Sequence, residues 1–508
     1  MTAELRSDYD LIIVGGGVAG CVLASAAQQL PGLSVLLIEA GADYGPRRHE
    51  WPAGILDARE LPREDLWNPG SAPHAWRGRV LGGSSCVNGC WHTWGADCDY
   101  DEWAEAAGPA GASFTALGLE PHRAAAARRL RIRPVTEDET SLWSAASVAG
   151  AQRLGYPLVE DLAARTAGAG VGLPPINAVG DLRWNAAFGY LDDCRADPEL
   201  DILDRATVQR LDFTGGRVTG VLVRQGERLR RFSAATVVLT AGAFGSPAVL
   251  MRSGIGHPRR LIEDGVSPLH ELPGVGANLS DHPGVTLRLT ASDALRQALA
   301  EIERRGKLYA SQVALKAASS VCSTDPPAGE WDLHLLPTAG APLFGARAPG
   351  EFEVGITAFL MKPRSRGTVR LSGDGQAEPD QNYLSDPDGH DVQALADGLE
   401  LAGELAATPE LAGLAAVDGT PDLADRSPAG LARLRGSLGT YWHPVGSCAL
   451  GTDPDRGAVV DGRGRVHGFD NLLVLDASIL PSTPRANTQL SVLAVASMLA
   501  GQLVAELR

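Results

Sequence analysis

The hydrophobic pattern near the start of the chain predicts a strand, a tight turn, a helix and a second strand. A short apolar run covers residues 11–14, glycines follow at once, and small residues lead to a second apolar run at 34–38. Short apolar runs bounded by glycines, with a small-residue helical stretch between them, are typical of a βαβ unit. The first part of the chain therefore predicts an α/β domain.

The glycines after the first strand have the spacing of a dinucleotide-binding loop. Gly15, Gly17 and Gly20 fit G-x-G-x-x-G, and Glu39 follows about 20 residues later, where a ribose-binding acid is expected. Gly15 permits the sharp turn, Gly17 lets the backbone approach a pyrophosphate, and Gly20 lets helix and strand pack closely. The helix N-terminus then offers unpaired N–H groups to the phosphates. The motif alone does not choose between FAD and NAD.

The pattern changes after residue 284, which indicates a second domain. Strand-like pieces at 354–360 and 367–371 are combined with helical ones such as 391–407. This combination predicts an antiparallel sheet with helices. Glycine turns and short apolar strands return near the C-terminus, where 472–475 is one example, and an apolar helix is predicted at 490–507.

Length, charge and cysteine content narrow the classes of function. The chain has 508 residues, more than one hydrophobic core accommodates, and a formal net charge of −16. This charge argues against a nucleic-acid partner, which favours a basic face. Seven cysteines without a C-x-x-C pair favour free thiols in a cytoplasmic protein and no metal site. No signal peptide fits the N-terminus, and polar residues interrupt the C-terminal helix, so no membrane span is expected.

Three further features are ambiguous on the residues alone. Residues 78–90 contain adjacent glycines and serines followed by Asn88 and Gly89, a composition that suits backbone wrapped against a ligand or any tight turn. Residues 43–76 form a stretch without periodicity, for which a lid over a site and a plain surface connection both remain open. A lone histidine such as His443 is more often a packed core residue than a catalytic one, and Trp442 is equally a core or a substrate-wall residue.

Six sequence blocks, in order from the first residues to the last, carry a family resemblance. They are residues 12–20 with 39–41, 78–85 with 88–89, 241–247 with 253–256, 273–278 with 281–282, 442–446, and 474–478 with 487–488. Together they resemble the glucose–methanol–choline (GMC) family of FAD-dependent oxidoreductases. The resemblance covers essentially the whole chain. It implies an α/β fold (α+β overall), with a Rossmann-like FAD-binding domain and a second, substrate-binding domain of antiparallel sheet plus helices.

The domain division that we predict on this basis is discontinuous. We assign residues 1–42, 77–130, 196–283 and 441–508 to the FAD-binding domain. Residues 131–195 and 284–440 form the predicted substrate-binding domain, and residues 43–76 are the lid candidate.

The resemblance implies how the cofactor is held. The glycine loop takes the pyrophosphate, Glu39 the adenosine ribose, and the backbone of Val208 the adenine. The implied FAD-binding residues are Gly15, Gly17, Val18, Ala19, Gly20, Glu39, Ala40, Arg79, Gly82, Gly83, Asn88, Gly89, Val208, Ala241, Gly242, Asp476, Ala477, Asn487 and Thr488. Some members attach FAD through a histidine inside the second block. The matching position here is Val87, so we predict noncovalent FAD, with His92 as an offset alternative attachment point.

The resemblance also implies that His443 and Asn487 are the catalytic pair. An alcohol C–H becomes a hydride donor only when its O–H proton is drawn away, and a histidine suits this task. His443 is then the base, Asn487 orients the alcohol oxygen, and hydride passes to flavin N5. A helix beginning near Thr488 would turn its N-terminus toward the reduced flavin. Trp442 is the candidate substrate contact.

The predicted reaction is oxidation of a primary or secondary alcohol to a carbonyl, with electrons passing to O2 or to another acceptor. A hydroxynitrile lyase that keeps FAD without net redox chemistry is the alternative, and a non-catalytic flavin-binding protein is a third reading. Flavin bleaching by substrate separates oxidation from lyase chemistry. A single dinucleotide fingerprint disfavours a pyridine-nucleotide-dependent reductase. The sequence carries no readable code for the substrate or for an oligomeric state.

Overall fold

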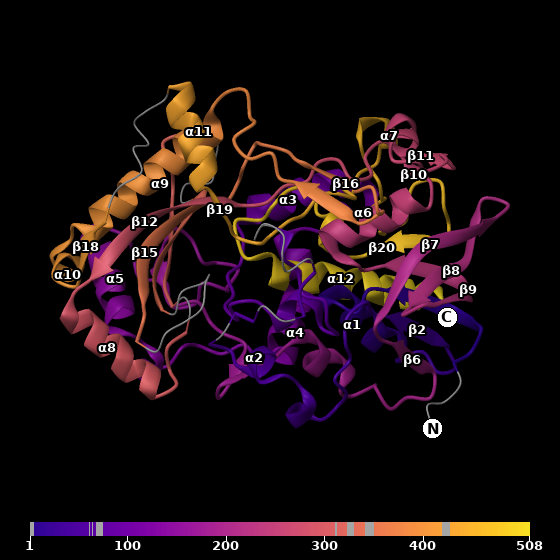
Figure 1. Cartoon of the computed structure of the whole chain (residues 1–508), viewed down its shortest axis with the longest axis horizontal. Helices are drawn as coiled ribbons and strands as arrows, with labels where there is room; N and C mark the ends of the chain where they lie inside the picture. Colours follow the sequence, from indigo (N-terminus) through magenta and orange to yellow (C-terminus); the bar gives the residue numbers. More distant parts are fainter. Residues whose placement is uncertain are drawn as a thin grey trace.

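Two seven-stranded sheets organise the protein. The computed structural model describes residues 5–59, 61–62, 65–67, 75–309, 312–322, 330–340, 350–418 and 427–508. The sheets occupy opposite ends of the molecule, and the C-terminal helix α12 (Thr488–Glu506) runs inward from the first sheet (Figure 1). Separate hydrophobic cores accompany the two sheets.

The first sheet has the strand order β6-β2-β1-β9-β8-β7, with β20 beside β9. Its strands β1, β2, β6, β9 and β20 run parallel, and β7–β8 is an antiparallel extension. The four apolar residues at the end of β1 are buried, since this strand lies between two others. The strands are β1 (Asp8–Val14), β2 (Val35–Ile38), β6 (Leu200–Leu203), β7 (Ala206–Thr214), β8 (Arg217–Gln225), β9 (Arg228–Leu239) and β20 (Leu472–Val474).

Helix α1 (Val18–Ala27) packs against α12, which also contacts α4 (Ala116–Arg129). Among the described helices, α12 is the one long and apolar enough to cross a membrane, and its apolar side chains are buried in the first core. A helix mostly buried in a core passes the same test of length and composition, so this feature is weak evidence for a membrane span.

The second sheet is antiparallel, with the order β18-β12-β15-β14-β13-β3 and β19 beside β12. Helices α9 and α5 pack against it. These elements are β3 (Gly170–Gly172), β12 (Pro283–Ala291), β13 (Ala314–Ala317), β14 (Leu333–Gly340), β15 (Glu353–Leu360), β18 (Ala415–Val417), β19 (Gly439–Thr440), α5 (Leu142–Arg153), α8 (Asp293–Arg304) and α9 (His390–Ala406). The predicted mixed α/β fold class is confirmed.

The remaining elements are shorter. They are α2 (Ala53–Leu56), η3 (Gly83–Cys86), α3 (Asp97–Ala107), β4 (Ala178–Val179), β5 (Leu182–Arg183), η6 (Ala187–Leu191), α6 (Gly242–Arg252), β10 (Ile255–Gly256), α7 (Pro258–Glu263), β11 (His270–Glu271), β16 (Thr368–Leu371), β17 (Ala377–Asp380), α10 (Pro409–Ala412), α11 (Pro428–Ser437) and η8 (Ala477–Ile479).

Two segments that we assigned to the substrate-binding domain pack in the first core. Phe188 and its neighbours in η6 contact α1, and Val369 of β16 is buried with them. Within the lid candidate, the described Trp51 and Ile55 are also buried in this core, whereas residues 60, 63–64 and 68–74 lie outside the described residues. The domain boundaries stay predictions.

Candidate active site

The two glycine-rich blocks near the N-terminus lie in direct contact. The Gly82 N–H donates to the Gly16 carbonyl oxygen at 2.7 Å. A Cβ placed on Gly83 would lie 2.8 Å from the Gly17 Cα, and Gly83 has φ +56°. Blocks separated by more than sixty positions therefore meet backbone to backbone, which side chains would prevent.

The glycine loop fits a pyrophosphate. Gly15 adopts φ +110°, and a Cβ there would lie 2.6 Å from the Thr240 carbonyl oxygen. By contrast, the nearest atoms to a Cβ on Gly17 are 3.9 Å away. Gly17 is the N-cap of α1 and has no side chain to cover the helix N-terminus. Val18 and Ala19 form the first turn behind it, and the N–H groups of a helix N-terminus are the ones that bind phosphates.

Glu39 lies at the end of β2 beside this loop and is 6% exposed. Its carboxylate accepts hydrogen bonds from the Gly16 N–H at 2.7 Å and the Gly41 N–H at 2.8 Å. Burial raises the pKa of Glu39 to about 7, although both N–H groups and the nearby Arg79 oppose the shift. Each oxygen retains a lone pair for a ribose hydroxyl. Ala40, next in the chain, is half-buried.

This geometry predicts a pH-dependent affinity for FAD. Ribose hydroxyls that donate to Glu39 favour its ionised form, so FAD binding expels a proton wherever the apoprotein carboxyl is protonated. Affinity should rise by up to about tenfold per pH unit below about pH 7 and level off above it. Titration of apoprotein with FAD from about pH 5 to about pH 8 measures this slope.

The Glu39→Gln variant should bind FAD more weakly at high pH, by about 1.5–3 kcal/mol, and should lose the slope. The control is Glu199→Gln, which removes a half-exposed carboxyl that pairs with Arg6 and should keep both affinity and slope. An unchanged slope in Glu39→Gln would assign the pH dependence to another group.

Asp476 fastens the end of β20 to the first turn of α6. One carboxylate oxygen accepts from the Gly242 N–H at 2.8 Å and from the Ser246 hydroxyl at 2.5 Å. The other accepts from the Ser478 N–H and hydroxyl at 2.8 and 2.6 Å. Four protein donors therefore hold the carboxylate. Ala241 is the N-cap of α6 and Ala477 begins η8, both half-buried beside it.

The other predicted cofactor residues lie on several different elements. The Asn88 amide donates to the Gln489 side-chain oxygen on the first turn of α12, which begins at Thr488. Gly89 follows Asn88 and is half-buried. The Arg79 guanidinium lies 4.8 Å from the centre of the Trp67 ring. On β7, the Val208 carbonyl accepts from Arg252 at 3.0 Å, so this oxygen already has a protein donor.

His443 is held by the backbone contacts of the segment that carries it. Its N–H donates to Asp281 Oδ1 at 2.8 Å, and Asp281 Oδ2 accepts from the Thr440 hydroxyl at 2.8 Å. Trp442, between them, has φ +60°, a conformation that costs free energy in a bulky residue. The Trp442 N–H donates to the Thr440 hydroxyl at 3.0 Å. Asp281 therefore fixes the strained turn that presents His443.

A second histidine connects His443 to the segment of Asn487. His282 Nδ1 lies 3.0 Å from His443 Nδ1, and His282 Nε2 lies 3.1 Å from the Pro484 carbonyl oxygen. Pro484 comes three residues before Asn487. The Thr93 hydroxyl donates to Asn487 Oδ1 at 2.9 Å and accepts from the Asn487 N–H at 3.2 Å. The Asn487 Nδ2 amide is thus the group able to donate to an alcohol oxygen.

Burial governs the electrostatics of this cluster. It lowers the pKa of His443 well below its ordinary value, and His282, Arg77 and His334 add to the shift. It also lowers the pKa of His282 to about 3. Both rings are therefore neutral near pH 7, and a neutral His443 is able to accept a proton.

A cluster of aromatic side chains from both halves of the molecule reaches His443 through Tyr441. Tyr441 stacks on Phe359 with ring centres 4.0 Å apart, and its ring centre is 4.3 Å from that of His443. Gly284 lies opposite Phe359 in the second sheet, where a Cβ would be 2.3 Å from the Phe359 ring. Trp91 lies 5.8 Å from Tyr441. These rings belong to a third hydrophobic cluster, distinct from the two main cores.

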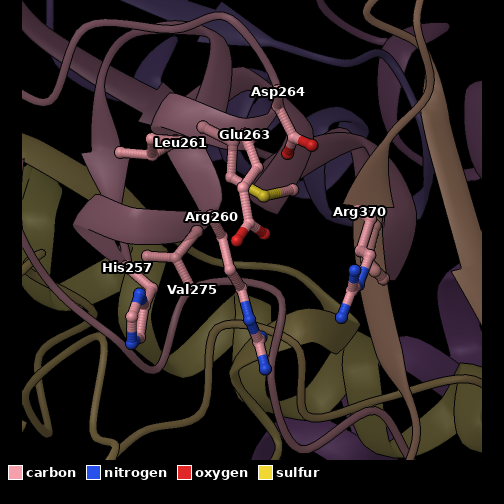
Figure 2. A pocket seen from close by; sticks show the side chains of 9 residues that line it. His257, Arg260, Leu261, Glu263, Asp264, Val275 and Arg370 are labelled. Atoms are coloured by element: carbon pink, nitrogen blue, oxygen red, sulfur yellow. The ribbon is translucent and has the colours of Figure 1, made fainter.

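Two pockets lie elsewhere, lined by none of the predicted site residues. A cavity of about 10 Å³ under α7 has room for a single water, with Arg260, Arg370 and Glu263 pointing into it (Figure 2). A groove of about 690 Å³ runs along β16 and β17, and Tyr383 in its lining donates to Asp281 at 3.2 Å. Across the described part of the chain, no group of three His, Cys, Asp or Glu side chains could hold a metal ion.

Sequence reasoning missed several residues that position the predicted ones. Asp281 and His282 lie inside a quoted family block, but nothing in the pattern indicates that they touch His443. Ser246 and Ser478 also lie inside family blocks, and Thr93 lies in none. A single hydroxyl is common and the partners of Thr93 and Ser246 are distant in the sequence, so the pattern does not indicate their contacts. The catalytic and cofactor roles of the predicted residues stay predictions.

Comparison with known proteins identifies the family. Residues 9–284 match the N-terminal family model, and residues 363–496 the C-terminal one, each described as GMC oxidoreductase. The chain is 35% identical to 5-(hydroxymethyl)furfural oxidase of Methylovorus sp., covering 98% of this chain and 99% of that relative. It is 32% identical to an oxygen-dependent choline dehydrogenase of Chromohalobacter salexigens, covering 97% and 94%.

Among solved structures, pyridoxine 4-oxidase from Mesorbium loti superposes with a TM-score of 0.81 at 28% identity, covering 97% of this chain and 99% of that one. Together with the two family matches, these likenesses extend over the glycine loops, the His443 segment and the second sheet alike. The predicted family and FAD dependence are confirmed: the chain belongs to the GMC oxidoreductase family and is an FAD-dependent alcohol oxidoreductase.

Proposed function

We propose that the protein oxidises a primary alcohol carried by a small planar ring to the aldehyde, with His443 as base and O2 as electron acceptor. The observation that carries this proposal is the aromatic cluster beside His443, in which Tyr441 packs against His443 while Phe359 and Trp91 pack against Tyr441. A flat, apolar ring packs well against aromatic side chains. The names of two relatives, 5-(hydroxymethyl)furfural oxidase and pyridoxine 4-oxidase, support the same substrate class.

In this proposal His443, Asn487 and Thr93 have separate roles. His443 accepts the alcohol O–H proton, which leaves negative charge on the oxygen. The Asn487 amide donates to that oxygen and fixes its orientation, while Thr93 holds the amide in place. FAD, when bound, accepts the hydride from the carbinol carbon, so the alcohol loses one proton and one hydride and becomes the aldehyde.

A cationic alcohol such as choline is the second substrate class, because one relative is named a choline dehydrogenase. Aromatic rings bind quaternary ammonium groups as well as flat rings. However, Asp281, the carboxylate that anchors His443, already accepts hydrogen bonds from two N–H groups and two hydroxyls. It is not placed to pair with a cation, so we favour the neutral ring.

We also propose that FAD binds noncovalently. Val87 stands at the attachment position and its side chain cannot form such a link. His92 is fully buried, and its Nε2 lies 3.1 Å from Asn177 Oδ1, which leaves it inside the protein. Acid precipitation should release all of the flavin into the supernatant. Flavin that stays with the pellet would contradict this proposal.

The substrate proposal is tested by a panel of alcohols assayed with O2 and with an artificial acceptor in parallel. We expect 5-(hydroxymethyl)furfural and pyridoxine to give kcat/KM at least about tenfold above choline, since a misfitting group costs about 1–3 kcal/mol. Hydrogen peroxide should form in equal amount to the aldehyde. A preference for choline, or turnover with the artificial acceptor alone, would overturn the proposal.

A further inference from the structure

His282 has no solvent contact, and its two ring nitrogens face different partners. The residue is 0% exposed, and its ring meets that of His443 edge to face with centres 5.2 Å apart. Nε2 lies 3.1 Å from the Pro484 carbonyl oxygen, and Nδ1 lies 3.0 Å from His443 Nδ1. Its backbone N–H donates to Asp281 at 2.8 Å, so the ring is fixed at both ends.

These partners determine where the protons lie. A carbonyl oxygen only accepts, so His282 Nε2 must carry the proton. His282 is neutral, because burial holds its pKa at about 3, and its Nδ1 is therefore a lone pair. The contact between the two Nδ1 atoms then requires a proton on His443 Nδ1. The remaining nitrogen of a neutral His443, Nε2, is left as a lone pair.

We propose that His282 is a positioning residue that holds His443 in its Nδ1–H tautomer and so keeps Nε2 as the nitrogen that takes the alcohol proton. This inference deepens the proposed function, because it rests on His443 as the base. A hydrogen bond to one ring nitrogen is the usual device that sets which nitrogen of a histidine is basic. Here the device is a second, neutral histidine rather than a carboxylate.

The arrangement also keeps the alcohol proton on His443 after Nε2 has accepted it. When Nε2 of His443 accepts the alcohol proton, the ring carries a proton on both nitrogens and still donates from Nδ1 to His282. His282 cannot pass a proton onward, because its own Nε2–H points at an amide carbonyl, which is not a base. The proton therefore remains on His443, and the bond that breaks is the alcohol O–H.

The charged and titratable groups around the pair are consistent with two uncharged histidines. Arg77 and His334 act on His443, and Asp99 and Lys362 act on His282 with opposite signs. Asp281 contacts the backbone of both histidines. Tyr441 packs against both rings. The hydrogen bond between the two Nδ1 atoms couples the rings directly, so it is the contact to test.

Two substitutions at position 282 distinguish a role in fixing the His443 tautomer from a purely structural role. His282→Asn places an acceptor oxygen near the former Nδ1, whereas His282→Leu fills the space without one, and both lose the bond to Pro484. We expect kcat/KM to fall by about 10–100-fold in the leucine variant and to be largely restored in the asparagine variant at equal flavin content. Equal losses in two flavin-loaded, folded variants would overturn the proposal.

A readout that does not need turnover comes from nitrogen-15 spectra of histidine-labelled protein, with the His443 signals assigned by their loss in His443→Ala. We expect neutral His443 in the wild type to show the proton on Nδ1, and His282→Leu to shift it toward Nε2. A neutral wild-type His443 with its proton on Nε2 would overturn the proposal. This spectrum shows which nitrogen of His443 carries the proton even if the leucine variant lacks flavin or if no alcohol on the panel is oxidised.

Discussion

His443→Ala is expected to lower kcat/KM for the alcohol by about 10²–10⁴-fold while the purified protein stays yellow. The neutral His443 ring is linked through His282 to Pro484, three residues before Asn487. Without it, the alcohol proton has no base, and hydride cannot leave the carbon. Flavin should remain because the residues placed for FAD lie in other segments. Steady-state turnover and the flavin-to-protein absorbance ratio measure both effects.

The dependence of kcat/KM on pH in the wild type is a second test of His443. His443 must be unprotonated to act, so activity falls as pH drops through its pKa. Burial places that pKa well below 6.5, so kcat/KM should stay level near neutral pH and decline only on the acid side. His122→Ala, which alters a half-exposed histidine of α4, is the matched control and should leave profile and turnover unchanged. Full activity in His443→Ala would remove it from the mechanism.

Gly20→Ala is expected to abolish FAD binding and to destabilise the first domain by more than about 3 kcal/mol. An added Cβ would lie 1.9 Å from the Gly15 carbonyl oxygen and 3.0 Å from the Thr240 hydroxyl. The first of these atoms is backbone of the phosphate turn, so relief requires helix α1 to move away from β1. We expect colourless protein with a lowered melting temperature, measured by flavin absorbance and thermal unfolding.

The matched control for Gly20→Ala is Gly501→Ala, another glycine inside a helix. A Cβ at Gly501 meets open space among the described residues, and the position is exposed. Alanine there should bind FAD normally and raise the free energy of unfolding by about 0.5–1 kcal/mol, because it favours the helix. Normal flavin content in Gly20→Ala would show that close packing at this glycine is not required for the cofactor site.

Much of the first domain was predictable because its signals are local. The glycine spacing and the apolar runs at 11–14 and 34–38 depend on nearest neighbours, and the structure has strand, turn and helix at these places. The contact of Gly82 and Gly83 with the first loop was not predictable from either block alone. It depends on chain paths that bring distant turns together.

The parts of the site that sequence reasoning missed depend on side-chain direction. His282 stands in a family block, yet only the fold turns its Nδ1 toward His443 and its Nε2 toward Pro484. Asp476 was expected to bind FAD, and the structure shows four protein donors on its carboxylate. The packing of η6 and β16 in the first core likewise depends on burial of side chains that periodicity assigns equally well to either domain.

The most direct test of the central claim is anaerobic reduction of the bound flavin by 5-(hydroxymethyl)furfural in a rapid-mixing spectrometer. We predict that the yellow colour of wild-type protein is lost with one equivalent of aldehyde formed per flavin, and that His443→Ala slows this loss by about 10²–10⁴-fold. A flavin that stays yellow while the alcohol is consumed, or bleaching at the same rate in His443→Ala, would contradict the account.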